Sequence, residues 1–143
     1  MLYIQLFMKY KFQDCIGSRL RSASRKIDAI YRQHLSHSGV TANQLSIMMA
    51  LYKTGETEQN EIARFLNLEK SSLSRNLVRL LDSNYVKKHG PVNRPIISLT
   101  KQGKRKVDDL APHWEKAMDK IHKVLNVQVL NAFQQFEESI TEL

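Results

Sequence analysis

A chain of 143 residues with 42% hydrophobic and 25% charged residues has the size and composition of one globular domain, which argues against a fibrous or disordered protein. Its single cysteine excludes an internal disulfide framework, and no apolar run approaches the roughly 18 residues needed to cross a membrane. The net charge of +8 lies in residues 61–106, where eleven cations face three acids, whereas the rest of the chain is balanced. We therefore expect a cytoplasmic protein with one surface suited to a polyanion.

The first two predicted elements are helices. Apolar residues at steps of three and four from Phe12 to about Leu35 predict a long amphipathic helix, which Gly39 ends. Thr41 is a good N-cap for a second helix, and Gly55 ends it. In this second helix we expect four apolar side chains to point inward: Leu45, Met48, Met49 and Tyr52.

A helix-turn-helix and a wing are predicted next. Thr57 is expected to open a short helix, and after a brief turn the following helix extends to about Asn84, which is the helix-turn-helix spacing. Short β-prone segments at residues 85–88 and 95–99, separated by turn residues, predict a hairpin. Pro95 has no N–H to donate, so its strand is expected to lie at an edge there.

Two helices close the chain. Thr100 caps a long one that continues to about Leu125, with apolar residues on a single stripe. Asn126 breaks or re-caps it, and a last amphipathic helix follows to Leu143.

This order of elements predicts a mainly α fold with a small β-hairpin wing. We expect one domain, in which a winged helix-turn-helix lobe at residues 41–100 lies between dimerisation helices at residues 1–38 and 101–143. The two ends carry more apolar surface than one small lobe can cover, so a two-fold homodimer is expected. The residues assigned to its interface are Phe7, Phe12, Ile16, Phe133, Phe136 and Ile140.

The helix that begins near residue 70 has one apolar face, while its other face carries hydroxyls, an amide and cations without an acid. A helix fits the major groove of DNA, where Arg can fork to guanine and Ser or Asn can reach base edges or phosphates. The hairpin adds further cations, and its arginine suits a narrow minor groove. The residues predicted to bind double-stranded DNA are Lys70, Ser71, Ser72, Ser74, Arg75, Asn76, Arg79, Lys87, Lys88 and Arg94.

Three segments together resemble the multiple-antibiotic-resistance regulator (MarR) family: G-V-T-A-N-Q-L-S-I-M-M-A-L, E-I-A-R-F-L-N-L-E-K-S-S-L-S-R-N-L-V-R-L-L and I-S-L-T-K-Q-G. The resemblance covers about residues 12–140. It implies a homodimeric bacterial or archaeal transcription regulator, usually a repressor, whose first and last helices form the dimer interface. Such a dimer presents two recognition helices to a palindromic operator. Relatives usually carry an acid two residues ahead of the wing arginine, a position that Val92 occupies here.

Other functions have less support in the sequence. His34 and His37 lie three residues apart, but two ligands make no metal site, and no phosphate-cradling loop is present, so we expect neither an enzyme nor a cofactor. Two alternatives stay open: a winged-helix dimer that acts as a protein–protein adaptor with weak DNA binding, and a thiol redox sensor through Cys15. Family members often release DNA when a small aromatic acid binds between the dimer helices and the DNA-binding lobe, and such a site would draw on Arg19, Arg25, Tyr31 and Trp114.

Overall fold

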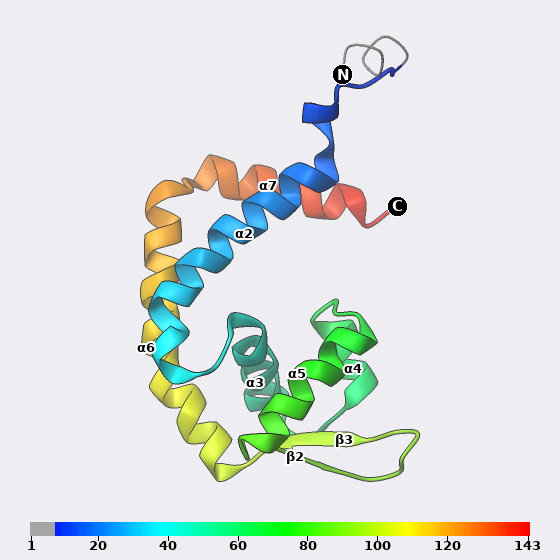
Figure 1. The fold of residues 1–143 in the computed structure, drawn as a ribbon, viewed down its shortest axis with the longest axis vertical. Helices are drawn as coiled ribbons and strands as arrows, with labels where there is room; N and C mark the ends of the chain where they lie inside the picture. Colours follow the sequence, from blue (N-terminus) through cyan, green and yellow to red (C-terminus); the bar gives the residue numbers. More distant parts are fainter. Residues whose placement is uncertain (1–7) are drawn as a thin grey trace.

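A computed structural model describes residues 8–143, which form mostly helices and one small sheet (Figure 1). The expected fold class, a mainly helical chain with a winged helix-turn-helix, is confirmed. Short 3-10 turns at Phe12–Asp14 and Ser36–Ser38 flank the first long helix. The helices and strands in chain order are α2 (Ile16–Leu35), α3 (Ala42–Thr54), β1 (Thr57–Glu58), α4 (Gln59–Phe65), α5 (Lys70–Asp82), β2 (Val86–His89), β3 (Ile96–Leu99), α6 (Lys101–Val124) and α7 (Val127–Ile140).

The hydrophobic core lies in residues 41–100, which we call the winged-helix lobe. Leu35 from α2 and Val107 and Leu110 from α6 cover this core from the side of the long helices. Burial of such side chains is the main stabilising contribution to a small domain. The lobe residues at its centre are at most 2% exposed: Leu45, Ile47, Met48, Leu51, Ile62, Leu73, Leu77, Leu80, Val86 and Ile97.

The start of α3 follows the sequence prediction. Thr41 Oγ1 accepts a hydrogen bond from the Gln44 amide at 3.2 Å, and Gln44 Oε1 accepts one from the Thr41 amide at 3.1 Å. This reciprocal capping box satisfies two backbone donors at the helix end. The expected inward position of Tyr52 is wrong, because its side chain is 49% exposed. The neighbouring carboxyl group of Asp108 on α6 raises the pKa of its hydroxyl.

The sheet has three strands in the order β1-β3-β2, so two expectations are corrected. Thr57 and Glu58 were expected in the first turn of a helix, but they pair with Ile97 and Ile96 as a short antiparallel strand. This pairing makes β3 the central strand and not an edge strand. Pro95 is tolerated because it lies just before β3, where its missing N–H interrupts no ladder bond.

The base of the wing is attached closely to the first turn of α6. Thr100 Oγ1 accepts a hydrogen bond from the Gly103 amide at 2.9 Å, and the Thr100 amide donates to the Tyr85 carbonyl at 3.0 Å. A Cβ atom on Gly103 would lie 2.0 Å from that same carbonyl oxygen. Only glycine fits here, because any side chain would displace the backbone at the base of β2.

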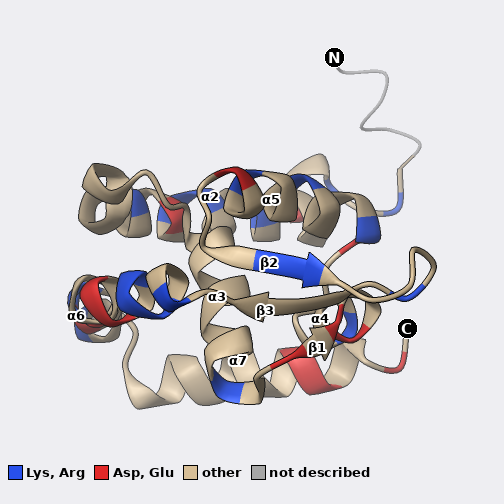
Figure 2. Cartoon of the chain, turned by 90° about the horizontal axis from the view of Figure 1, so that it is seen from below, with Lys and Arg blue, Asp and Glu red and all other residues tan. Residues whose placement is uncertain are grey.

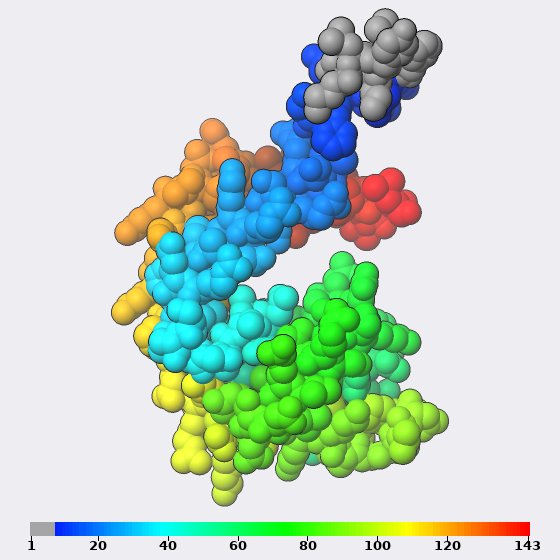
Figure 3. Space-filling view, viewed as in Figure 1, coloured from blue at the N-terminus to red at the C-terminus, as the bar shows by residue number. Residues whose placement is uncertain are grey.

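The chain ends extend away from the lobe as long helices. α2 packs along α6, and its regular α-helix begins at Ile16 and not at Phe12, which lies in a 3-10 turn. α7 overlaps α2 in Figure 1, but the view in Figure 2 places the two helices on opposite sides of the molecule. No residue of α7 is buried. The space-filling view shows a deep indentation between these ends and the winged-helix lobe (Figure 3). None of the helices in residues 8–143 has the length and apolar character needed to cross a membrane.

Candidate nucleic-acid interface

The N-terminus of α5 is open to ligands. The helix begins at Lys70, and Glu69 at its N-cap makes no side-chain capping hydrogen bond in the described structure. Ser71 and Ser72 therefore stand inside the first turn, beside backbone amides that have no partner within the helix. Such a turn suits a phosphate oxygen, which can accept from the amides and from the two hydroxyls.

The outward face of α5 carries the predicted side chains. Leu73, Leu77 and Leu80 point into the core, which turns the polar residues of the helix outward. The amide of Asn76 donates to the Ser72 carbonyl at 3.0 Å, so only one N–H and the oxygen of that amide remain for a base. Ser72 and Asn76 are half-buried, whereas the other five predicted residues are exposed: Lys70, Ser71, Ser74, Arg75 and Arg79.

Two further residues belong to this face although the sequence did not point to them. Gln59, the first residue of α4, donates from Nε2 to the hydroxyl of Ser74 at 3.3 Å and so steers that hydroxyl. Val78 is 55% exposed on α5, between the predicted polar positions. A valine in a groove can contact the methyl group of thymine. The sequence did not indicate that Val78 faces outward, because an apolar residue in a helix is usually expected on the buried side.

The wing continues the cationic surface. α5 packs against β2, and the two elements lie side by side in both orientations of the molecule (Figures 1 and 2). Lys87 and Lys88 are exposed on β2, and Val86 before them is buried. Figure 2 shows lysine and arginine on α5, on β2 and at the start of α6. We call the outward side of α5 together with Lys87 and Lys88 the basic face.

Two acidic side chains reach the wing: Glu58, which lies in β1, and Glu56, which directly precedes β1. The carboxylate of Glu58 lies 2.6 Å from Nη2 of Arg94, and that of Glu56 lies 3.7 Å from Nε2 of His89. Both acids fall just outside the cation-rich stretch of the sequence, so the charge pattern did not reveal them. Val92, which occupies the position of the acid in relatives, is fully exposed. The acid nearest to the wing arginine is therefore Glu58.

The predicted dimer residues lie on the exposed ends. Exposed fractions are 78% for Phe12, 53% for Ile16, 53% for Phe133 and 43% for Ile140, while Phe136 is half-buried. Phe7 lies outside the described residues. Exposed side chains of this size in a row are typical of an interaction surface. The interface itself stays a prediction, as does a redox role for Cys15, which is exposed where α2 begins.

The junction between α2 and α6 holds the aromatic residues named for a ligand site. Tyr31 and Trp114 are half-buried against the core, while Arg19 and Arg25 are exposed on α2. The Tyr31 hydroxyl donates to Met118 Sδ at 3.2 Å. Burial, and secondarily the charge of Asp28, raises the pKa of Tyr31.

The histidines do not gather into a metal centre. The ring of His37 lies 4.5 Å from that of His113, between centroids, and His34 Nδ1 lies 2.9 Å from the carbonyl oxygen of Ile30. In residues 8–143 no group of three or more His, Cys, Asp or Glu side chains is placed to hold a metal ion.

Solved structures share this fold along nearly the whole chain. BpsR of Bordetella bronchiseptica, described for the regulation of its DNA binding by 6-hydroxynicotinic acid, is 20% identical with a TM-score of 0.82, over 95% of this chain and 100% of that one. PcaV of Streptomyces coelicolor, complexed with its natural ligand, is 15% identical with a TM-score of 0.80, over 95% and 98%. A mutant MarR of E. coli, complexed with operator DNA, is 17% identical with a TM-score of 0.78, over 92% and 99%.

Similarity in sequence covers less of the chain than similarity in structure does. No curated protein matches the chain. A sequence model of the MarR family matches residues 38–94, which contain α3, the helix-turn-helix and most of the wing. Residues 38–94 therefore match the MarR family in sequence, and the described chain has the fold of the solved structures named above.

Proposed function

We propose that the protein is a homodimeric transcription repressor that binds a palindromic operator through its basic face and is released by a small ligand. One observation carries this proposal. From Lys70 to Arg79 the exposed side of α5 presents hydroxyls, an amide and cations without an acid, directly beside the cations of β2, and the exposed Asp82 lies only at the end of the helix. A surface of this composition suits a helix that enters the major groove between two phosphate backbones.

The arginines of α5 are free to reach DNA. The ion pairs within residues 8–143 involve only Arg64, His89 and Arg94 among the basic residues. Arg75 and Arg79 are thus exposed without an acidic partner in the described structure. Arg75 lies in the second turn of α5, where side chains of a recognition helix reach base edges, and we assign it to guanine. Arg79, one turn later, is assigned to the backbone.

A dimer explains the exposed ends and the expected symmetry of the operator. Apolar side chains on α7 and at the start of α2 would be buried by a second copy, and each buried Å² stabilises by about 25 cal/mol. Two copies related by a two-fold axis would place two α5 helices in successive major grooves, about 34 Å apart. The operator should then be a palindrome.

Two solved structures of this fold support the proposed release by a small ligand. BpsR is described as regulated by 6-hydroxynicotinic acid, and PcaV was solved with its natural ligand. In this chain Tyr31 and Trp114 are half-buried where α2 meets α6, next to the winged-helix lobe. A flat aromatic acid bound there would contact both the ends and the lobe, and could so alter their relative position.

The test is selection of genomic DNA fragments by the purified protein at two salt concentrations, followed by sequencing. We expect a recovered palindrome with half-sites about one helical turn apart, and recovery that falls steeply with salt because phosphate contacts release counterions. Recovery without sequence preference at both salt concentrations would contradict the proposal. It would direct attention to a protein partner for the basic face.

A further inference from the structure

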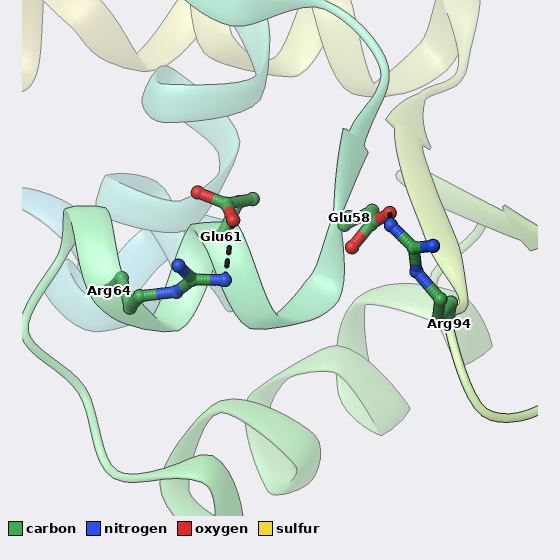
Figure 4. Close-up of polar contacts among 4 residues, drawn as sticks. All are labelled: Glu58, Glu61, Arg64 and Arg94. Atoms are coloured by element: carbon green, nitrogen blue, oxygen red, sulfur yellow. Dashed lines mark hydrogen bonds and ion pairs between the residues drawn. The ribbon is translucent and has the colours of Figure 1, made fainter.

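The wing arginine is held by an acid from a distant part of the chain. Glu58 Oε1 lies 2.6 Å from Arg94 Nη2, across 36 residues of sequence (Figure 4). The backbones that carry the two side chains are fixed to each other. The Gln59 amide, next to Glu58, donates to the Pro95 carbonyl at 2.9 Å, and the Arg94 amide donates to the Pro91 carbonyl at 3.0 Å. The contact therefore joins two ordered segments.

A second pair in the same region provides a natural comparison. Glu61 and Arg64 also form an ion pair, at 2.5 Å, but both belong to α4 and lie one turn apart (Figure 4). Their side chains are 51% and 72% exposed. A local pair of this kind contributes only to its own helix. The Glu58–Arg94 pair instead determines where the guanidinium of the wing arginine is located, because it joins the wing loop to β1.

The geometry favours positioning of Arg94 over its withdrawal from DNA. A guanidinium has five N–H donors, and the contact with Glu58 occupies one terminal nitrogen. The Arg94 side chain remains 68% exposed, while Glu58 is the more buried partner at 31%. The carboxylate thus lies on the protein side of the guanidinium, and the remaining donors face solvent. Fixing a long side chain in advance lowers the entropy lost when it binds.

We propose that Glu58 is a positioning residue for Arg94 in DNA binding and acts only through Arg94. This inference rests on the proposed function and on the sequence-based prediction that the wing arginine, Arg94, contacts a narrow minor groove. An arginine fixed in this way can enter a narrow minor groove, where the negative potential is strongest.

The test is a double-mutant cycle of Glu58→Gln and Arg94→Ala, measured as affinity for the selected operator. Glu58→Gln raises the net charge by one, so bulk electrostatics alone would tighten DNA binding. Positioning predicts the opposite sign, a loss of roughly two- to five-fold, the range of an exposed charge pair. In the Arg94→Ala background the same change should weaken binding no further.

Glu61→Gln is the matched control. It changes the net charge equally and breaks the comparable pair with Arg64, but it leaves the wing untouched. We expect unchanged or slightly tighter binding. Melting temperatures of all variants should agree within a few degrees, because both pairs are partly exposed.

A readout of sequence preference separates positioning from a structural role. Replacing A·T pairs next to each half-site by G·C pairs should weaken the wild type, because the minor groove widens, and this penalty should shrink in both Glu58→Gln and Arg94→Ala. The inference is overturned if Glu58→Gln binds as tightly as Glu61→Gln, or if it still weakens binding after Arg94 is removed. If the wild type itself selects no operator, the proposed function fails. If the wild type selects an operator but the variants behave in either of these two ways, only the role of Glu58 fails.

Discussion

The winged-helix lobe and the two ends of the chain differ in where their large apolar side chains lie. In the lobe, residues such as Leu45, Leu73 and Ile97 are at most 1% exposed. At the ends, Phe12 and Phe133 are more than half exposed, although they follow equally regular helical patterns. The amphipathic pattern therefore identifies a face that becomes buried, but it does not say whether the same chain or another one covers it.

The net charge does not separate the two regions in this way. Residues 41–100 carry eight cations and five acids, and residues 1–38 and 101–143 together carry fourteen cations and nine acids. The lobe is distinguished by the basic face on α5 and β2, for which we propose an anionic partner, whereas the ends expose apolar side chains, for which we propose a second copy. Four experiments can test this comparison.

Gly103→Ala tests whether the lobe depends on its attachment to α6. The new Cβ would lie 2.0 Å from the Tyr85 carbonyl oxygen, so the backbone must move, and we expect a loss of about 3 kcal/mol or more in the free energy of unfolding. Denaturant unfolding measures it. Gly17→Ala is the control, because its Cβ would meet only the flexible end of Arg21 at 3.3 Å and alanine favours a helix. Equal stability of both variants would show that the wing base tolerates displacement.

Phe133→Glu tests whether the ends are completed by a second copy. A charge in the centre of an apolar interface should weaken the dimer by about 2–3 kcal/mol. Sedimentation velocity as a function of concentration would detect the dissociation. Phe65→Glu offers a matched control, because Phe65 is 63% exposed on the lobe and outside the proposed interface. A wild type that sediments as a monomer at all concentrations would remove the explanation offered here for the exposed ends.

Arg75→Ala tests the basic face of the lobe. If this side chain forks to a guanine, its loss should weaken operator binding by about 1–3 kcal/mol and relax the preference at one base pair of each half-site. Titrations with the operator and with a variant at that base pair measure both effects. Lys116→Ala removes a cation from an exposed position of α6 and should change neither. Unaltered affinity of Arg75→Ala would show that α5 is not the reading helix.

Tyr31 lies where the two regions meet and should give the smallest effect. Burial first, and the charge of Asp28 second, raise its pKa above the ordinary value of 10.0. The unfolded chain therefore loses this proton at lower pH than the folded chain, so stability should fall as the pH rises from 10.0 towards the folded pKa. Tyr31→Phe should flatten this decline, as measured by melting temperature between neutral and alkaline pH. Parallel declines in both proteins would argue against burial of the hydroxyl.

The parts of the fold that local sequence specifies were predictable. The Thr41 cap, the helix-turn-helix and the apolar face of α5 depend on neighbours within one or two turns, so their patterns are visible in the chain. β1 was not predictable, because two residues have no periodicity and their strand partner lies some 40 positions later in the sequence. The expected place of Pro95 at a sheet edge failed for the same reason.

The candidate site was predictable to a similar extent. The outward side of α5 follows directly from its leucines. The contact of Glu58 with Arg94 does not, because it spans 36 residues and depends on the pairing of β1 with β3. The bond from Asn76 to the Ser72 carbonyl was also missed, because an amide on an outward face can turn back to its own helix.

The close approach of Gly103 to Tyr85 has a mechanical consequence. α6 runs as one helix, with Pro112 inside it, from that contact to the region of α7, and its 24 residues span about 36 Å. Because the wing base cannot slide along its first turn, α6 acts as a lever arm with the wing at one end and the apolar surface at the other. A tilt of about 10° at the far end would carry the wing through roughly 6 Å, which is about the width of the minor groove.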